Sequence, residues 1–549
     1  MLNQAHSLCL QTRTMLLASP DQQDSSLEQA LEQAAGKTVT GAVATAIAAA
    51  LFERQQAELA MQWIDLALIV QADCIEALAV RATIESSRSD TLKAIATYRQ
   101  IIAIAPAQVQ AYREISLLYK NQRDWDAALW AADCALVICP HMADMCANRI
   151  DLLLRLQRDD EALRFLQALP AAIYDSPPLI NARVTALNSS GRFDEASQIL
   201  RSGVRRAMES GEFDFTIINQ WLTHLVSSGN SARELSGDLK YFASCLGGDR
   251  RHQGLIASYA MIQAWLGDHA GAVLEIAGQH ADFEALPDVD DDRAMRVFYR
   301  YLGQLARAHL VAPSESPPPV GTLHVLGESH CLSPANSVFP WHGQVLKASG
   351  KFVMGIQMHH LAQAGDNVYK QRVLSHLRKI TDGSLLLTIG EIDCRPVEGM
   401  WRAAARGGMP LDDLMELTVN GYFSFLDQAL CQRAWLPITI QGVPAPGYDL
   451  TDRRDPGDKK GFIAMIRRVN TLLEAGARRR QWHFLNIHAA TARQDGMGNG
   501  MWHLDRYHLS PSFYQGAMQW INNRASDRGG RCNRRFNFAP NRQNKKFLK

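Results

Sequence analysis

The sequence of 549 residues lacks several features that would assign it to a class at once. Its ten cysteines are scattered, and none has the Cys-x-x-Cys spacing of a zinc site or the density of a disulfide framework. The formal net charge of +1 gives no overall field to attract nucleic acid or an anionic membrane. No apolar run reaches the ~18 residues of a membrane helix, and residues 1–20 show no signal-peptide pattern. We therefore expect a cytoplasmic protein with reduced thiols, no membrane segment and no nucleic-acid partner.

Motifs for common cofactors are also missing. No Gly-x-x-x-x-Gly-Lys-Ser/Thr segment is present to hold a nucleotide phosphate. No carboxylate or cysteine stands in the sequence at a spacing that would complete a metal site with His359, His360 or His503. We therefore predict neither a cofactor nor a bound metal.

The first half of the chain repeats. Phrases of the form Asp-x-Ala begin at Asp126, Asp160 and Asp194, which are 34 residues apart. A small side chain at a fixed position lets two helices approach closely, so we expect the repeated alanines to be buried at helix crossings. Traced upstream in the same register, the series is Ala60, Ala94, Ala128, Ala162 and Ala196.

This pattern resembles the tetratricopeptide repeat, in which a pair of antiparallel helices recurs every ~34 residues. Pro106 and Pro140 stand twelve residues after two of the alanines, where the family often ends its second helix, and the next two repeats lack that proline. The resemblance covers residues 40–205 and weakens beyond them. It implies an all-α solenoid over 40–310 whose concave surface binds a protein or peptide. A spacer or a dimerisation scaffold is the alternative.

The pattern changes after a proline-rich linker at residues 311–320, because its three successive prolines cannot continue a helix. Short apolar runs then alternate with helix-length amphipathic stretches, which predicts a three-layer α/β/α domain with a mostly parallel sheet over 321–522. We expect residues 1–39 to be a helical or flexible segment and residues 523–549 to be a basic, disordered tail. The predicted strands are residues 322–326, 351–354, 384–389, 436–441 and 482–487.

Three polar segments lie in this second part, and the first two directly follow predicted strands, where parallel sheets place their sites. Ser329 stands just after the first strand, on a turn that Gly327 opens. Residues 388–395 follow a buried strand. Asp505 and His508 lie on the loop after the last strand and before a predicted helix at 512–521.

The order of these segments resembles that of SGNH (GDSL-type) hydrolases over residues 321–521. The resemblance implies that Ser329 is the nucleophile, that His508 takes its proton, and that Asp505 orients the imidazole. The resemblance also implies an oxyanion hole or substrate contacts. For these we choose Gly355, Gly390, Glu391, Asp393 and Arg395.

Two positions depart from the family pattern. Glu328 stands where the family has aspartate, a change that we expect to lie away from the nucleophile. Ile392 stands where the family has an asparagine that donates to the oxyanion, and losing such a donor costs about 10²–10³ in rate in other enzymes. Arg395 could supply the missing donor, or it could form a salt bridge with Glu391 or Asp393.

Each of these residues also has a purely structural interpretation. Ser329 could cap a helix, and Asp505 could hold His508 only to shape the loop. The sequence therefore leaves two functions open. The first is a serine esterase or acyl transferase that acts on acyl esters, such as acetyl esters of carbohydrates, and is recruited by its repeats. The second is an interaction protein whose SGNH-like domain has lost turnover.

Overall fold

The computed structural model describes most of the chain, and its two compact units, Met1–Ala186 and Leu187–Lys549, are considered separately. The tail predicted at 523–549 and about half of the segment 1–39 lie outside the described residues. No helix within the described part of the chain is long and apolar enough to span a membrane. The described residues are 2–17, 27, 30, 31, 34, 40–210, 215–228, 250–285, 290–311, 317–396, 399–406, 409–447 and 458–516.

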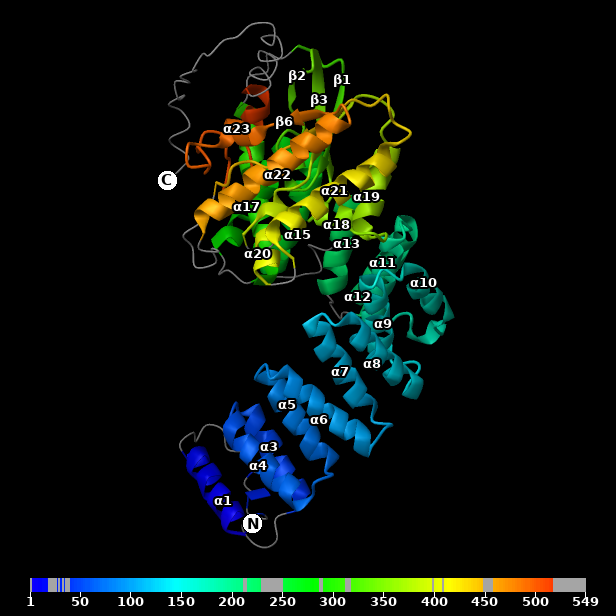
Figure 1. Ribbon diagram of the computed structural model, residues 1–549, viewed down its shortest axis with the longest axis vertical. Helices are drawn as coiled ribbons and strands as arrows, with labels where there is room; N and C mark the ends of the chain where they lie inside the picture. The colour runs from blue at the N-terminus through cyan, green and yellow to red at the C-terminus, as the bar shows by residue number, and fades with distance from the viewer. Residues whose placement is uncertain are drawn as a thin grey trace. The chain divides into compact units, whose positions relative to one another are not determined.

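The first unit is built from helix pairs with a regular spacing (Figure 1). The first helix of each pair begins at residue 41, 75, 109, 143 or 177, and the second begins 16 residues later, so both series have a period of 34. After α1 (Leu2–Leu17), the helices are α3 (Gly41–Glu53), α4 (Ala57–Val70), α5 (Ile75–Ser87), α6 (Thr91–Ile104), α7 (Val109–Gln122), α8 (Trp125–Ile138), α9 (Ala143–Arg155), α10 (Asp159–Ala168), η2 (Ala171–Ile173), α11 (Pro177–Ser189) and α12 (Phe193–Ser210). The first unit is a tetratricopeptide-like solenoid, and α12, which belongs to the second unit, begins at the residue that the same spacing gives.

The turn inside each pair repeats as well. The residue two positions before the second helix has a left-handed backbone, with φ of 62° at Gln55, 63° at Ser89, 63° at Arg123 and 59° at Gln157. Gly191 takes the same place in the last pair, with φ of 75°. The 34-residue period therefore extends to the backbone of the turns.

All five repeated alanines are buried, as predicted. Each is the fourth residue of the second helix in its pair, and each is 0% exposed. At Ala128 the approach is close enough for the Ser116 hydroxyl of α7 to donate to its carbonyl oxygen at 2.8 Å. The small side chain is therefore required by the packing of the pair.

The second unit continues with helices before its sheet begins. These are α13 (Phe215–Ser228), α15 (Arg250–Leu266), α16 (Ala270–Gln279), η3 (Ala281–Ala285) and α17 (Asp290–Val311). Residues 267–269 form the turn between α15 and α16, and Asp268 repeats the left-handed backbone with φ of 63°.

The sheet of this unit is mixed. Its order is β2-β3-β1-β4-β5-β6, and β2 runs antiparallel to β3 while the other neighbours pair in parallel. The sequence analysis missed β2 and placed the second strand too late, because it took the end of β3 for the whole strand. The strands are β1 (Gly321–Gly327), β2 (Val338–Trp341), β3 (Gln344–Phe352), β4 (Ser384–Thr388), β5 (Ile438–Gln441) and β6 (His483–Leu485).

Helices follow the strands in the chain and lie around the sheet (Figure 1). Their apolar side chains form one buried cluster with those of the sheet. Leu387 of β4 and Ile440 of β5 lie in this cluster with Tyr422 and Phe462, and all four are fully buried. The helices of this part are α18 (Met358–Ala362), α19 (Val368–Arg378), α20 (Met400–Ala405), α21 (Leu411–Leu430), α22 (Lys459–Arg479) and α23 (Ile487–Thr491), with η4 (Ser329–Leu332) and η5 (Ile392–Cys394) after β1 and β4.

The helices before the proline-rich segment also pack against this sheet. The Trp265 indole donates to the carbonyl oxygen of Leu332 at 2.9 Å, and the Phe298 ring contacts Phe352 of β3 with centroids 5.7 Å apart. Asp268 pairs with Lys347 of β3 at 2.6 Å. The segment α15–α17 and the sheet therefore share one compact unit.

Replacing Ala128 by Leu should overpack its crossing and lower the free energy of unfolding by about 1–3 kcal/mol. The matched control is Ala103→Leu on α6, where the side chain is exposed and we expect a change within about 0.5 kcal/mol. Urea unfolding of both variants checks this. If Ala128→Leu is as stable as the wild type, α7 and α8 leave room for a larger side chain at this crossing, and the prediction is wrong.

Candidate active site

The ends of β1 and β4 meet closely, and this brings the segments after them together. A Cβ atom at Gly327 would lie 2.2 Å from Oγ1 of Thr388 and 2.5 Å from its carbonyl oxygen, so glycine is required there. Ser329 follows on η4 and is 6% exposed. Gly390 lies in the loop after β4, with φ of 140°.

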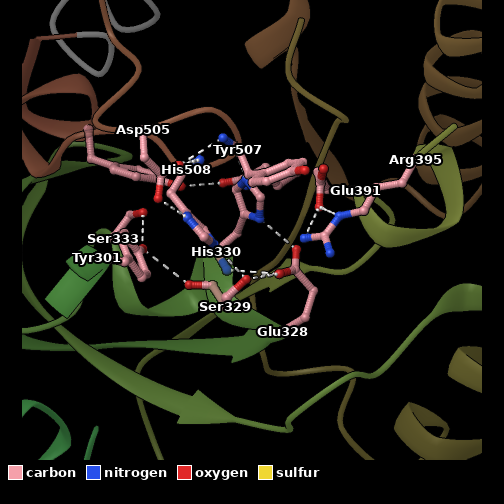
Figure 2. A network of polar contacts seen from close by, with 12 residues as sticks. Tyr301, Glu328, Ser329, His330, Ser333, Glu391, Arg395, Asp505, Tyr507 and His508 are labelled. Atoms are coloured by element: carbon pink, nitrogen blue, oxygen red, sulfur yellow. Dashed lines mark hydrogen bonds and ion pairs between the residues drawn. The ribbon is translucent and has the colours of Figure 1, made fainter. Parts of the chain in front are cut away.

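The structure brings Ser329, His508 and Asp505 into one hydrogen-bonded chain (Figure 2). Ser329 Oγ lies 2.8 Å from His508 Nε2, and His508 Nδ1 lies 2.7 Å from Asp505 Oδ2. The other carboxylate oxygen of Asp505 accepts from the backbone N–H groups of Tyr507 and His508, each at 2.7 Å. The aspartate therefore both shapes the loop and orients the imidazole.

Glu328 contacts the serine directly, so the expectation that this position lies away from the nucleophile was wrong. Its Oε2 accepts from Ser329 Oγ at 2.8 Å and from the backbone N–H of His330 at 3.0 Å. Glu328, and not Ser329, is the N-cap of η4. The serine hydroxyl therefore lies between two acceptors, the Glu328 carboxylate and His508 Nε2.

His330 balances the buried charge of Glu328, and the sequence analysis did not identify it as a site residue. Its Nδ1 lies 2.8 Å from Glu328 Oε1, and its Nε2 lies 2.9 Å from the carbonyl oxygen of Tyr507. Both partners are acceptors, so both ring nitrogens donate and the ring carries a proton on each. Its position next to Ser329 in the sequence was the only signal.

Electrostatics in this buried pair agree with the hydrogen bonds. Burial opposes the charged form of both groups, but the mutual attraction outweighs it. It lowers the pKa of Glu328 and raises the pKa of His330 to about 9. Burial likewise opposes the charge of Asp505, but His508 and the backbone N–H groups lower the pKa of that carboxyl to about 2.

Glu328, His330 and Glu391 have ligand atoms within 4.8 Å of one another, a spacing at which a metal ion could bind. A histidine binds a metal through a free lone pair on a ring nitrogen. Both nitrogens of His330 already donate to oxygen atoms, so the arrangement describes a charge network and not a ready metal site.

The predicted residues after β4 are close to this network but have structural partners. The Arg395 guanidinium pairs with Glu391, with Nη2 2.7 Å from Oε2, and lies over the Tyr507 ring at 4.7 Å. Of the alternatives open for Arg395, the structure shows the salt bridge with Glu391. Ile392 is buried and offers no side-chain donor.

Asp393 is fully buried, and its carboxylate accepts from the backbone N–H groups of Met358 and His359 at 2.8 and 3.1 Å. Burial raises its pKa to about 7 despite these two donors. Its contacts hold the start of α18. Gly355 lies in the turn before α18, with φ of 71°, and makes none of the described hydrogen bonds to Ser329.

A tyrosine from α17 completes the site. The Tyr301 ring stacks on the imidazole of His508, with centroids 3.8 Å apart and planes 15° apart (Figure 2). No sequence pattern pointed to it, because it precedes Ser329 by 28 residues and lies before the proline-rich segment.

The solved structures that resemble this chain include tetratricopeptide repeat proteins. A tetratricopeptide repeat protein from Parabacteroides merdae is 12% identical, covers 51% of this chain and 99% of its own, and has a TM-score of 0.35. A thermophilic protein of this type from Thermus thermophilus is 19% identical, covers 34% and 98%, and scores 0.27. YrrB, described as having an unusual peptide-binding site, is 15% identical, covers 43% and 97%, and scores 0.25.

No family model and no curated protein matches the sequence. The 34-residue period of the helices and turns defines the repeats of this chain.

The Glu328–His330 pair predicts a pH dependence of stability. The folded pKa of His330 is raised to about 9, against roughly 6.5 in an unfolded chain. The contribution of His330 to the free energy of unfolding is therefore fully present below about pH 6.5 and is lost as the pH rises through about 9. Replacing His330 by Gln leaves the carboxylate unpaired and should cost about 3–5 kcal/mol at neutral pH.

Urea unfolding of the wild type and His330→Gln across this pH range checks the sign. Because other groups titrate in both proteins, the quantity to follow is the difference between the two free energies of unfolding. We expect that difference to shrink above about pH 9. A difference that stays constant with pH would mean that His330 is not charged in the folded state.

Proposed function

We propose that the second unit is a serine-dependent ester hydrolase or acyl transferase of the SGNH type. The observation that carries this proposal is the chain from Ser329 Oγ through His508 to Asp505, with contacts of 2.8 and 2.7 Å. Such a triad is recognised by geometry and by the role of each group, and not by its position in the sequence. Its place at the carboxyl ends of β1 and β4 also fits an α/β fold.

In this mechanism Ser329 Oγ attacks the carbonyl carbon of an acyl ester, and its proton passes to His508 Nε2. The ester C–O bond then breaks, and the leaving alcohol takes the proton from His508. Asp505 stabilises the imidazolium between these steps. Water or a second alcohol attacks the acyl-enzyme in the same way, which gives hydrolysis or acyl transfer.

The oxyanion must be held without the usual asparagine. Ile392 has no donor, and the Arg395 guanidinium is paired with Glu391. We therefore assign oxyanion stabilisation to backbone N–H groups, among them that of Ser329. The slight exposure of Ser329 favours small acyl groups, in keeping with acetyl esters of carbohydrates as the proposed substrates.

One alternative for this unit is a domain that has the triad but no turnover. Two observations favour it: Ile392 takes the place of a donor, and the Glu328 carboxylate competes with His508 for the serine proton. The alternative and the esterase differ in whether Ser329 reacts.

A fluorophosphonate probe tests this reactivity. We expect the wild type to be labelled, because His508 can take the proton as the serine attacks phosphorus, and Ser329→Ala to remain unlabelled. In an ester assay Ser329→Ala should lose on the order of 10⁴- to 10⁶-fold in kcat. Ser349→Ala on β3 is the matched control and should label like the wild type. Absence of labelling in the wild type would favour the domain without turnover.

The first unit supports a second function, that of a protein-interaction scaffold. A groove of about 330 Å³ is lined by the first helices of successive pairs, α7, α9 and α11. Arg113 pairs with Asp144 at 2.7 Å and Lys120 with Asp151 at 2.8 Å, so its charges are balanced. Asn181 lines the groove, and its buried Oδ1 has no hydrogen-bond partner among the residues that the structure describes. An extended peptide could donate to it through a backbone N–H.

Peptides selected from a displayed random library can test the groove. We expect Asn181→Ala and Leu117→Arg each to weaken binding of a selected peptide by about tenfold or more, because both line the groove. Val137→Arg is the control, since Val137 is 83% exposed on α8 and does not line the groove. Equal affinities for all the variants, with unchanged melting temperatures, would place binding elsewhere.

A further inference from the structure

Tyr301 contacts the proposed base of the triad and the main chain of its nucleophile. Its ring covers one face of the His508 imidazole, and its hydroxyl lies 3.2 Å from the carbonyl oxygen of Ser329. The same hydroxyl lies 2.7 Å from Ser333 Oγ. Figure 2 shows the tyrosine beside Ser333, next to the serine and the histidine. One side chain thus contacts the base and the backbone of the nucleophile.

The direction of these hydrogen bonds follows from the chemistry of the partners. A carbonyl oxygen can only accept, so the phenol donates to Ser329 and accepts from the hydroxyl of Ser333. Burial raises the pKa of Tyr301, so the phenol keeps its proton at neutral pH and stays a donor. The main chain at Ser329 is therefore tied to α17.

The stacked ring acts on His508 in a different way. The hydrogen bonds of the two ring nitrogens to Ser329 and Asp505 hold the edge of the imidazole in place. These contacts alone leave the ring plane free to rotate about the line that joins the two nitrogens. Tyr301 is 0% exposed and occupies one face, which limits that motion and excludes water from it. An aromatic face also attracts the positive charge that the imidazole gains when it takes the serine proton.

We propose that Tyr301 is a positioning residue, which holds the His508 imidazole in line with Ser329 Oγ and fixes the Ser329 main chain from a helix outside the predicted hydrolase segment. This inference rests on the function proposed above. It makes α17 part of the active unit, although the proline-rich segment separates it from β1 in the sequence.

The experiment compares Tyr301→Leu, which removes the ring, with Tyr301→Phe, which keeps the ring and removes the hydroxyl. Tyr299→Leu is the matched control, because Tyr299 is a buried tyrosine on the same helix and packs edge-to-face against Phe283. All variants are made in the full chain, and melting temperatures are recorded. If Tyr301→Leu fails to fold, Tyr301→Met replaces it.

The first readout does not require turnover. In proton NMR, the Nδ1–H of His508 that is bonded to Asp505 should give a low-field signal, which Asp505→Asn assigns by removing it. We expect the wild type, Tyr301→Phe and Tyr299→Leu to keep this signal. Tyr301→Leu should lose or broaden it, because the ring is free to move. A signal that persists in Tyr301→Leu as in Tyr299→Leu would overturn the proposal.

The second readout is the hydrolysis of p-nitrophenyl acetate. Tyr301→Leu should lower kcat by about 10- to 100-fold with KM nearly unchanged, since the base is misaligned and substrate contacts are intact. Tyr301→Phe should recover most of kcat. If Tyr301→Leu and Tyr299→Leu lower kcat by the same factor, Tyr301 contributes only to packing, and the proposal is wrong. If the wild type neither turns over nor labels with fluorophosphonate, the proposed function fails, and the NMR comparison still decides whether Tyr301 holds His508.

Discussion

The carboxylate of Glu328 is buried at the end of β1, and much of the site depends on how its charge is compensated. A buried carboxylate without a partner costs several kcal/mol, so His330 must carry the opposite charge. His330 in turn donates to the carbonyl oxygen of Tyr507, the residue before His508. By pairing with Glu328 and donating to Tyr507, His330 therefore links the turn that carries Ser329 to the loop that carries Asp505 and His508.

The helices before the proline-rich segment provide the other support. Trp265 and Tyr301 bond to backbone carbonyl groups of η4, and Tyr301 also covers His508. Interactions of this kind, made by residues far away in the sequence, fix the groups that a reaction needs without contacting a substrate. The helices α15 and α17 of the second unit are thus part of the candidate site.

The sequence predicted what local patterns encode. The alanine period predicted the helix pairs and the burial of Ala128. The end of a predicted strand pointed to Ser329, and the resemblance to SGNH hydrolases pointed to His508, which the structure brings within 2.8 Å of it. It did not reveal β2, a short edge strand that contains Pro340, because so short a run has no clear alternation. The role of Glu328 and the position of Tyr301 depend on contacts between distant segments, which leave no local signal. The catalytic roles remain a proposal.

The account depends most on Ser329 acting as a nucleophile, and a trapped acyl-enzyme tests this most directly. The wild type is mixed with p-nitrophenyl acetate, quenched in acid and digested, and its peptides are measured by mass spectrometry. The account predicts one acetyl group on the peptide that contains Ser329, absent after His508→Ala because the serine then has no base. Turnover of the ester with the acetyl group on another residue, or without any dependence on Ser329, would contradict it.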